Sequence, residues 1–119
     1  MRRGQKQFYD SDYFNVEVAL NELLGSLSPT GNSSVSSVND SASNQTLLSA
    51  NTDRKGLILF NNSSSIAYVK FGATATTTDF TIRLVPYATY TSTPPVYSGR
   101  IDCIWSADST GAILITELT

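Results

Sequence analysis

The sequence predicts a mainly β protein: an antiparallel β-sandwich of jelly-roll or Ig-like type, or a small barrel, with an N-terminal arm containing a short helix. From Thr46 onward, about five to seven short strand patterns recur roughly every 8–12 residues, separated by turn residues. Ser and Thr together supply 31 residues and Asn eight more, which is typical of a chain rich in strands and turns. We therefore divide the chain into an arm over residues 1–45 and a β-sandwich domain over residues 46–119.

The arm carries a basic end and one helical pattern. Apolar residues recur at three- and four-residue steps after Asp12, which can cap a helix of about three turns. A helix this short is marginal alone in water, so its apolar stripe needs a partner. Packing on its own sandwich and docking on another chain both remain open, and we expect an assembly arm. The candidate partner-contact residues are Arg2, Arg3, Lys6, Tyr13, Val16, Leu20 and Leu23.

A Ser/Asn-rich stretch over residues 28–45 joins this helix to the sandwich. Its only residues that could be buried are Val35, Val38 and Ala42. This composition predicts a linker or a weak edge strand.

Four strand patterns follow in order. Residues 57–60 form a continuous apolar run, which indicates a strand covered on both faces. Residues 67–71 and 80–84 alternate, and the second run places Phe80 on the same side as Ile82 and Leu84. Residues 112–118 form the last strand. The expected core residues are Phe60, Val69, Phe71, Ile82, Leu84, Ile101, Trp105 and Ile113.

The stretch over residues 97–105 is the centre of the predicted domain. Strand periodicity puts Ile101, Cys103 and Trp105 on one face, and Arg100, Asp102 and Ile104 on the other. Arg100 and Asp102 can therefore reach each other or neighbouring strands. The single tryptophan, Trp105, is the expected core anchor because a side chain of that size can organise a small core. The single cysteine lies on the apolar face, so we expect a small buried hydrophobe and no nucleophile.

Charge and hydropathy exclude several classes of partner. Eight basic against ten acidic residues, with no histidine, give no electrostatic case for nucleic-acid binding. No apolar run approaches the roughly 20 residues that span a bilayer, so no membrane partner is expected. The basic start lacks the apolar core of a signal peptide, which predicts synthesis in the cytoplasm without export.

No catalytic constellation is visible, so we expect no enzyme, no catalytic residue, no cofactor and no metal. Triads and the common zinc sites need histidine or several cysteines, and the carboxylates fall in separate turns and strands. A carbohydrate-binding module is a second possibility, because exposed tyrosines on a β-sandwich can stack on sugars, although tyrosines more often fill interfaces. The tyrosines in question are Tyr68, Tyr87, Tyr90 and Tyr97.

An ordered series of short segments carries a family resemblance over residues 51–118. The segments are Asn51-Thr-Asp-Arg-Lys-Gly, Asn61-Asn-Ser-Ser, Tyr68-Val-Lys-Phe-Gly72, Phe80 to Leu84, Tyr97-Ser-Gly-Arg-Ile-Asp102, Ile104-Trp105 and Ile115-Thr-Glu-Leu118. The series resembles small β-rich virion proteins of tailed bacteriophages, of the structural, head-decoration or fibre type. The chain departs from that pattern in Thr91-Ser-Thr-Pro-Pro-Val96 and at Cys103, both of which concern packing.

The resemblance implies a capsid decoration or cement protein that binds the major capsid protein lattice or other virion proteins, made in the host cytoplasm and located in the virion. It also implies a homo-oligomer, with a trimer as the common state for decoration proteins of this size. A neck, adaptor or tail-fibre component is the alternative within the same class. The first 45 residues lie outside the resemblance.

Overall fold

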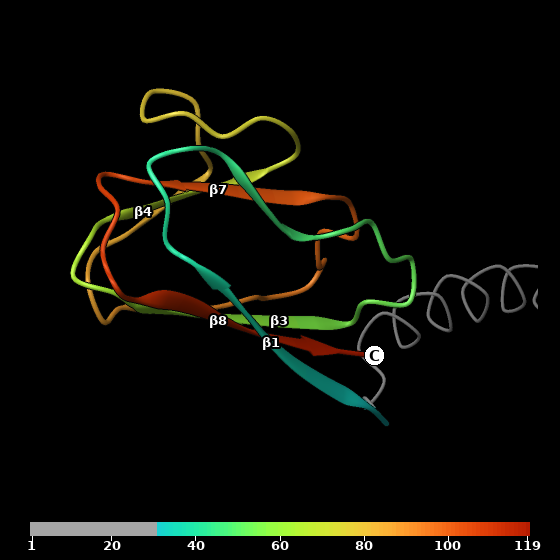
Figure 1. Cartoon of the computed structure of the whole chain (residues 1–119). Coiled ribbons are helices and arrows are strands. Elements are labelled where there is room, and N and C mark those ends of the chain that lie inside the picture. Colours follow the sequence, from blue (N-terminus) through green and yellow to red (C-terminus); the bar gives the residue numbers. More distant parts are fainter. Residues whose placement is uncertain (1–30) are drawn as a thin grey trace, which may run out of the picture.

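The computed structural model describes residues 31–119, which form two antiparallel sheets facing each other (Figure 1). The described residues contain strands and no helix, so the expected mainly β class is confirmed; the expected helix lies outside them. The strands are β1 (Ser33–Asn39), β2 (Gln45–Leu48), β3 (Gly56–Asn62), β4 (Ala67–Phe71), β5 (Ile82–Leu84), β6 (Thr89–Thr91), β7 (Ile101–Trp105) and β8 (Ala112–Leu118).

The two sheets have four strands each. Sheet A has the order β1-β8-β3-β6, and sheet B has the order β2-β7-β4-β5. Successive strands alternate between the sheets, and only the step from β4 to β5 stays within one sheet. The first and last strands pair over their full lengths, from Ser33 opposite Leu118 to Asn39 opposite Ala112. The fold is thus closed by contacts between residues far apart in the sequence.

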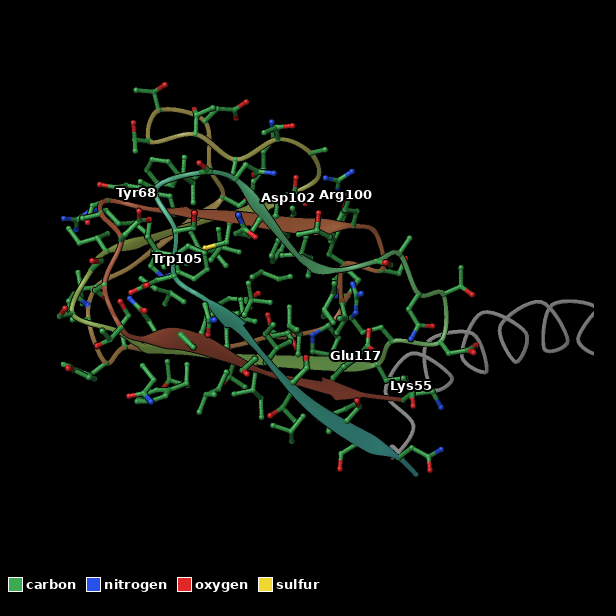
Figure 2. The ribbon with its side chains drawn as sticks, in the orientation of Figure 1. Lys55, Tyr68, Arg100, Asp102, Trp105 and Glu117 are labelled. Atoms are coloured by element: carbon green, nitrogen blue, oxygen red, sulfur yellow. The ribbon has the colours of Figure 1, made fainter. Side chains whose placement is uncertain are left out.

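The core lies between the sheets, where each strand contributes alternate side chains. Trp105 is 1% exposed and lies between the two sheets, as Figure 2 shows. Ile101 and Cys103 share its face of β7 and are fully buried, as the strand periodicity predicts. Four further members of the cluster are Leu57, Leu59, Ile113 and Ile115. Of the expected core residues, Val69, Leu84, Ile101, Trp105 and Ile113 are buried, while Phe71 and Ile82 are partly buried against the cluster.

Phe60 was expected in the core, and this prediction is wrong. On β3 the inward positions are Leu57, Leu59 and Asn61, so Phe60 points away from the core and lies opposite Leu114. A continuous apolar run has no alternation of polar and apolar residues, so its sequence does not show which alternate residues point inward, here called the phase of the strand. The phase is set by Asn61, whose buried amide Nδ2 donates to the carbonyls of Ser65 (2.8 Å) and Leu84 (2.9 Å).

The run over residues 80–84 also differs from its prediction. Strand β5 contains only Ile82 to Leu84, and Phe80 precedes it with 37% of its surface exposed. The Phe80 ring meets Tyr68 edge to face, with ring centroids 4.9 Å apart. Tyr68 lies on the outward side of β4, so this aromatic pair covers the outer face of sheet B instead of its core.

Of the two possibilities for residues 28–45, the structure contains the edge strand. Strand β1 lies at the edge of sheet A, and six of its seven residues are exposed. Val38 is the member that packs against the core, opposite the buried Ile113. The pairing of sheet A therefore begins at Ser33, ahead of the expected domain boundary at residue 46.

Candidate interaction surface

The outer face of sheet A is an uncharged surface. Because opposite residues in an antiparallel pair point to the same side, the register of the strands fixes which side chains lie there. The apolar members in the middle of the face are Leu114, Ile58 and Phe60, with Val35 and Leu118 beside them. The remaining outward residues are Ser33, Ser37, Asn39, Gly56, Asn62, Thr89, Thr91, Ala112 and Thr116.

This face is partly accessible. Val35 is 71% exposed and Leu114 is 37% exposed, while Ile58, Phe60 and Leu118 are half-buried. Apolar surface without charge is typical of the centre of protein–protein interfaces, where charged residues are depleted. The sequence indicated that residues 57–60 are covered on both faces. Among the described residues, none forms a second layer over this side of β3.

The outer face of sheet B is different, because it carries charges that are paired within the chain. Arg100 donates two hydrogen bonds to Asp102, from Nε to Oδ1 (2.8 Å) and from Nη2 to Oδ2 (3.0 Å). Figure 2 shows both side chains on the outer side of β7. Lys70 on β4 bonds Asp79 in the following loop at 2.6 Å. The expectation that Arg100 and Asp102 reach each other is confirmed.

Asp102 also fastens a loop across sheet B. Its Oδ2 accepts from Asn44 Nδ2 (3.0 Å), and Asn44 Oδ1 accepts from the backbone N–H of Ala75 (2.9 Å), which is buried. Burial opposes the ionisation of Asp102, but hydrogen bonds from Arg100, Asn44 and Thr46 outweigh it and lower its pKa below the usual value. The carboxylate is therefore ionised and satisfied, which indicates a structural role.

Asp40, which directly follows the last residue of β1, also connects loops through hydrogen bonds to its carboxylate. Its carboxylate accepts from the Ser63 hydroxyl (2.7 Å), from the Ser109 hydroxyl and from the Ser109 backbone N–H (3.0 Å). Burial opposes its ionisation, yet these bonds together lower the pKa of Asp40. The group joins the end of β1 to the loops that precede β4 and β8.

The side chain of Arg54 is fully buried and makes four hydrogen bonds. Its Nε donates to Glu117 Oε2 (2.8 Å), and its Nη2 donates to the Ser49 carbonyl (2.8 Å). Its Nη1 donates to the carbonyls of Tyr97 (2.8 Å) and Gly99 (3.0 Å). The guanidinium fork suits this task because it offers several donors in fixed directions.

We call Arg54 and the residues that accept its hydrogen bonds the Arg54 node. Within this node, Gly99 also has a steric role. A Cβ at this position would collide with the phenol ring of Tyr97. The neighbouring backbone is tied to the same region, since Asn51 N–H donates to the Ser98 carbonyl at 2.7 Å. Sequence reasoning singled out neither Arg54 nor Asp40, because no local pattern distinguishes a buried charge from an exposed one.

The tyrosines considered for carbohydrate stacking do not form one platform. Tyr68 lies on sheet B, whereas Tyr87 lies in the turn between β5 and β6 and is 63% exposed. Tyr90 and Tyr97 come together around Phe71: the Phe71 and Tyr97 rings stack 4.9 Å apart, and the Phe71 and Tyr90 centroids are 6.2 Å apart. These three rings line a hollow of about 330 Å³ together with Leu57, Ser92, Thr93, Pro95 and Val96.

Pro95 and Val96 separate this hollow from a larger one of about 600 Å³, whose lining includes Asp53, Lys55 and Thr119. The Cys103 thiol opens to neither, because it is fully buried, and burial raises its pKa. The expectation that Cys103 is a small buried residue on the apolar face is confirmed, while its lack of a nucleophilic role stays a prediction.

Within residues 31–119, no three His, Cys, Asp or Glu side chains gather as a metal ion would require. The same part of the chain has no helix long and apolar enough to cross a membrane. The absence of enzymatic activity and of a metal stays a prediction. The candidate contacts Arg2, Arg3, Lys6, Tyr13, Val16, Leu20 and Leu23 lie outside the described residues.

Comparison of the chain with known protein families, with curated proteins and with solved structures gave no match.

Proposed function

We propose that this chain is a non-enzymatic structural protein of a tailed-bacteriophage virion, and specifically a head-decoration (cement) protein. In this role it binds the major capsid protein lattice through protein–protein contacts, with neither cofactor nor turnover. It is made in the host cytoplasm and is incorporated into the virion.

The observation that carries this proposal is the meeting of three separate segments of the resemblance at Arg54. Arg54 belongs to the first segment, Tyr97 and Gly99 to the fifth, and Glu117 to the last. Loss of either Arg54 or Glu117 would leave a buried charge without its partner, which is costly in free energy. Displacement of the Tyr97 and Gly99 carbonyls would remove hydrogen-bond acceptors from the same buried charge. The residues of all three segments therefore depend on one another. The series is therefore consistent with one structural unit, which supports treating it as a resemblance and not as a set of chance matches.

The strand order supports the same proposal at the level of the fold. Two sheets ordered β1-β8-β3-β6 and β2-β7-β4-β5 have the arrangement of an eight-stranded jelly roll. Jelly rolls occur in viral capsid proteins and also in lectins, so the fold is compatible with both candidate functions. The choice between them depends on the surface.

The surface favours contact with protein. The outer face of sheet A is apolar and uncharged at its centre around Leu114, Ile58 and Phe60. The buried carboxylates Asp40 and Asp102 are held by internal hydrogen bonds, so neither is free for chemistry. We assign the outer face of sheet A to the contact with the capsid lattice.

A second candidate function is glycan binding, in a receptor-binding or tail-fibre component. The hollow lined by Phe71, Tyr90 and Tyr97 favours it, because aromatic rings beside a cavity can stack on sugar rings. Titration of the purified chain with host polysaccharide tests this candidate. Saturable binding that Tyr97→Ala abolishes, in a variant that remains folded, would shift the proposal from decoration to receptor binding.

The proposal is tested by adding the purified full-length chain to capsids assembled from the major capsid protein alone. Retention on sedimented capsids with a copy number that follows the number of lattice sites supports decoration. Gel densitometry of complete particles gives that copy number. About a dozen copies or fewer would instead assign the chain to the neck or tail, and no retention on any particle would refute the virion role.

Deletion of residues 1–27 tests the assembly arm separately. The cut ends before Asn32, whose carbonyl accepts from the Thr119 N–H at 2.9 Å, so every described hydrogen bond is kept. We expect a folded domain with nearly unchanged melting temperature that no longer attaches to particles. Unfolding of the truncated domain would show that the apolar stripe belongs to its own core.

A further inference from the structure

Within residues 31–119, no strand pairs with the outer edge of β1, and this edge differs from the other sheet edges in length and regularity. Sheet A ends at β1 and β6, and sheet B ends at β2 and β5. Strands β5 and β6 have three residues each, and β2 has four with a register shift between Thr46 and Leu48. Strand β1 has seven residues in one regular register with β8. A long regular edge is a template for another strand unless Lys, Pro, a bulge or a covering element protects it. Ser33–Asn39 contains no Lys, Pro or bulge, and no other strand of residues 31–119 pairs with its outer edge.

The hydrogen bonds at the two ends of β1 show which backbone groups are left unpaired by β8. Thr119 N–H donates to the Asn32 carbonyl (2.9 Å), and Asp40 N–H donates to the Gly111 carbonyl (3.1 Å). In an antiparallel ladder every second residue exchanges bonds with a given neighbour, so the even-numbered residues between these ends face β8. The residues whose N–H and C=O groups point to the open edge are Ser33, Val35, Ser37 and Asn39.

The side chains of β1 suit contact with an identical strand. Val35 is 71% exposed, the highest fraction among the exposed large hydrophobic residues of the described chain. It lies on the outer face of sheet A opposite Thr116, beside the uncharged surface. Strand β1 carries no charge, so two copies can lie side by side without opposing like charges.

We propose that β1 is a self-association edge, and that it pairs antiparallel with β1 of a second copy across a two-fold axis. Val35 lies at the axis, opposite Val35 of the second copy, and Ser33 faces Ser37 of that copy. In this register, residues whose backbone N–H and C=O groups point to the open edge lie opposite residues of the same kind in the second copy, as an antiparallel ladder requires. It joins the two copies of sheet A into one sheet and makes their uncharged outer faces continuous. The inference does not depend on a virion role.

The first test is the solution mass of the full-length chain. Light scattering should give twice the 12.9 kDa of one chain in the wild type. Val35→Lys places two ammonium groups opposite each other and should give the mass of a single chain at the same concentration. The matched control is Leu114→Lys, the same charge on the same face but one strand away from the edge, and it should remain a dimer.

A pair of proline variants isolates the backbone contribution. Ser37→Pro removes an N–H that points to the open edge, so the domain should fold and the dimer should dissociate. Ser36→Pro removes an N–H that faces β8 at Ile115, so this variant should lose fold stability as well. Equal effects of the two substitutions on the melting temperature would contradict the assigned phase of the ladder.

Oxidative crosslinking tests the register. Val35→Cys should form an intermolecular disulfide, while Leu114→Cys should not, and the buried Cys103 does not compete. A monomeric wild type would overturn the proposal. So would an oligomer, including a trimer, that keeps its mass in Val35→Lys.

Discussion

Removing the Arg54 guanidinium should destabilise the domain strongly. The side chain has no solvent exposure, and Arg54→Ala leaves Glu117, which is only 16% exposed, without its cation. Breaking a buried ion pair on one side costs about 3–5 kcal/mol. The carbonyls of Ser49, Tyr97 and Gly99 lose their donor as well, at about 1 kcal/mol or more for each one that water cannot reach. We therefore expect a loss of at least about 3–5 kcal/mol, a large part of the typical stability of about 5–15 kcal/mol.

Denaturant unfolding monitored by Trp105 fluorescence measures this loss, since the single tryptophan is buried in the folded state. Arg54→Lys keeps the charge but cannot reach all four acceptors, so we expect a smaller loss. Arg83→Ala, at an exposed position on β5, is the control and should stay within about 0.5 kcal/mol of wild type. A loss below about 1 kcal/mol in Arg54→Ala would refute the assigned role of the node.

Three further outcomes are expected. Trp105→Ala should cost about 3–5 kcal/mol by denaturant melts followed by circular dichroism; Trp105→Phe should cost less, because it removes an indole N–H with no partner among the described residues, and equal losses would contradict this. Asp40 and Asp102 have lowered pKa values in the folded state, so the stability that they supply is present above the unfolded pKa of about 3.9 and is lost as pH falls through the folded values. In Asp102→Asn the melting temperature should therefore fall less steeply with decreasing pH in this acid range. The exposed control Asp53→Asn should not show this change. Leu114→Glu should leave the melting temperature nearly unchanged and abolish capsid retention, whereas Thr77→Glu in the loop over sheet B should retain it, and equal retention of both variants would remove the outer face of sheet A from the interface.

Alternation of side chains predicts part of the fold: it places Ile82 and Leu84 correctly, but not Phe80, which precedes β5 and is exposed. Periodicity fixes the faces of β7, and it assigns Ile101, Cys103 and Trp105 correctly because the polar Asp102 marks the opposite face, although Ile104 lies there too. It fails on β3, where four consecutive apolar residues leave the phase open and a buried Asn61 decides it. A period of two thus identifies the strand faces only when a polar residue marks one of them.

The polar nodes could not have been predicted, because their partners come from distant segments. Arg54 meets residues 43 and 63 positions away, and Asp40 meets Ser109 at a separation of 69. A single sequence does not indicate which exposed-looking Arg or Asp will be enclosed by such partners. The outer face of sheet A could not be predicted for the same reason. Its residues come from β1, β3, β6 and β8, and only the register of these strands places them on one surface.

The distribution of charge makes stability and interaction separable by mutation. Arg54, Asp40 and Asp102 bind loops to the sandwich through internal hydrogen bonds, so substitutions there act on the free energy of unfolding. Outward residues such as Val35 and Leu114 have exposed side chains, so polar substitutions there lose little packing. A variant that abolishes attachment without lowering the melting temperature therefore identifies a contact surface. A variant at a buried node that abolishes attachment identifies only a domain that no longer folds.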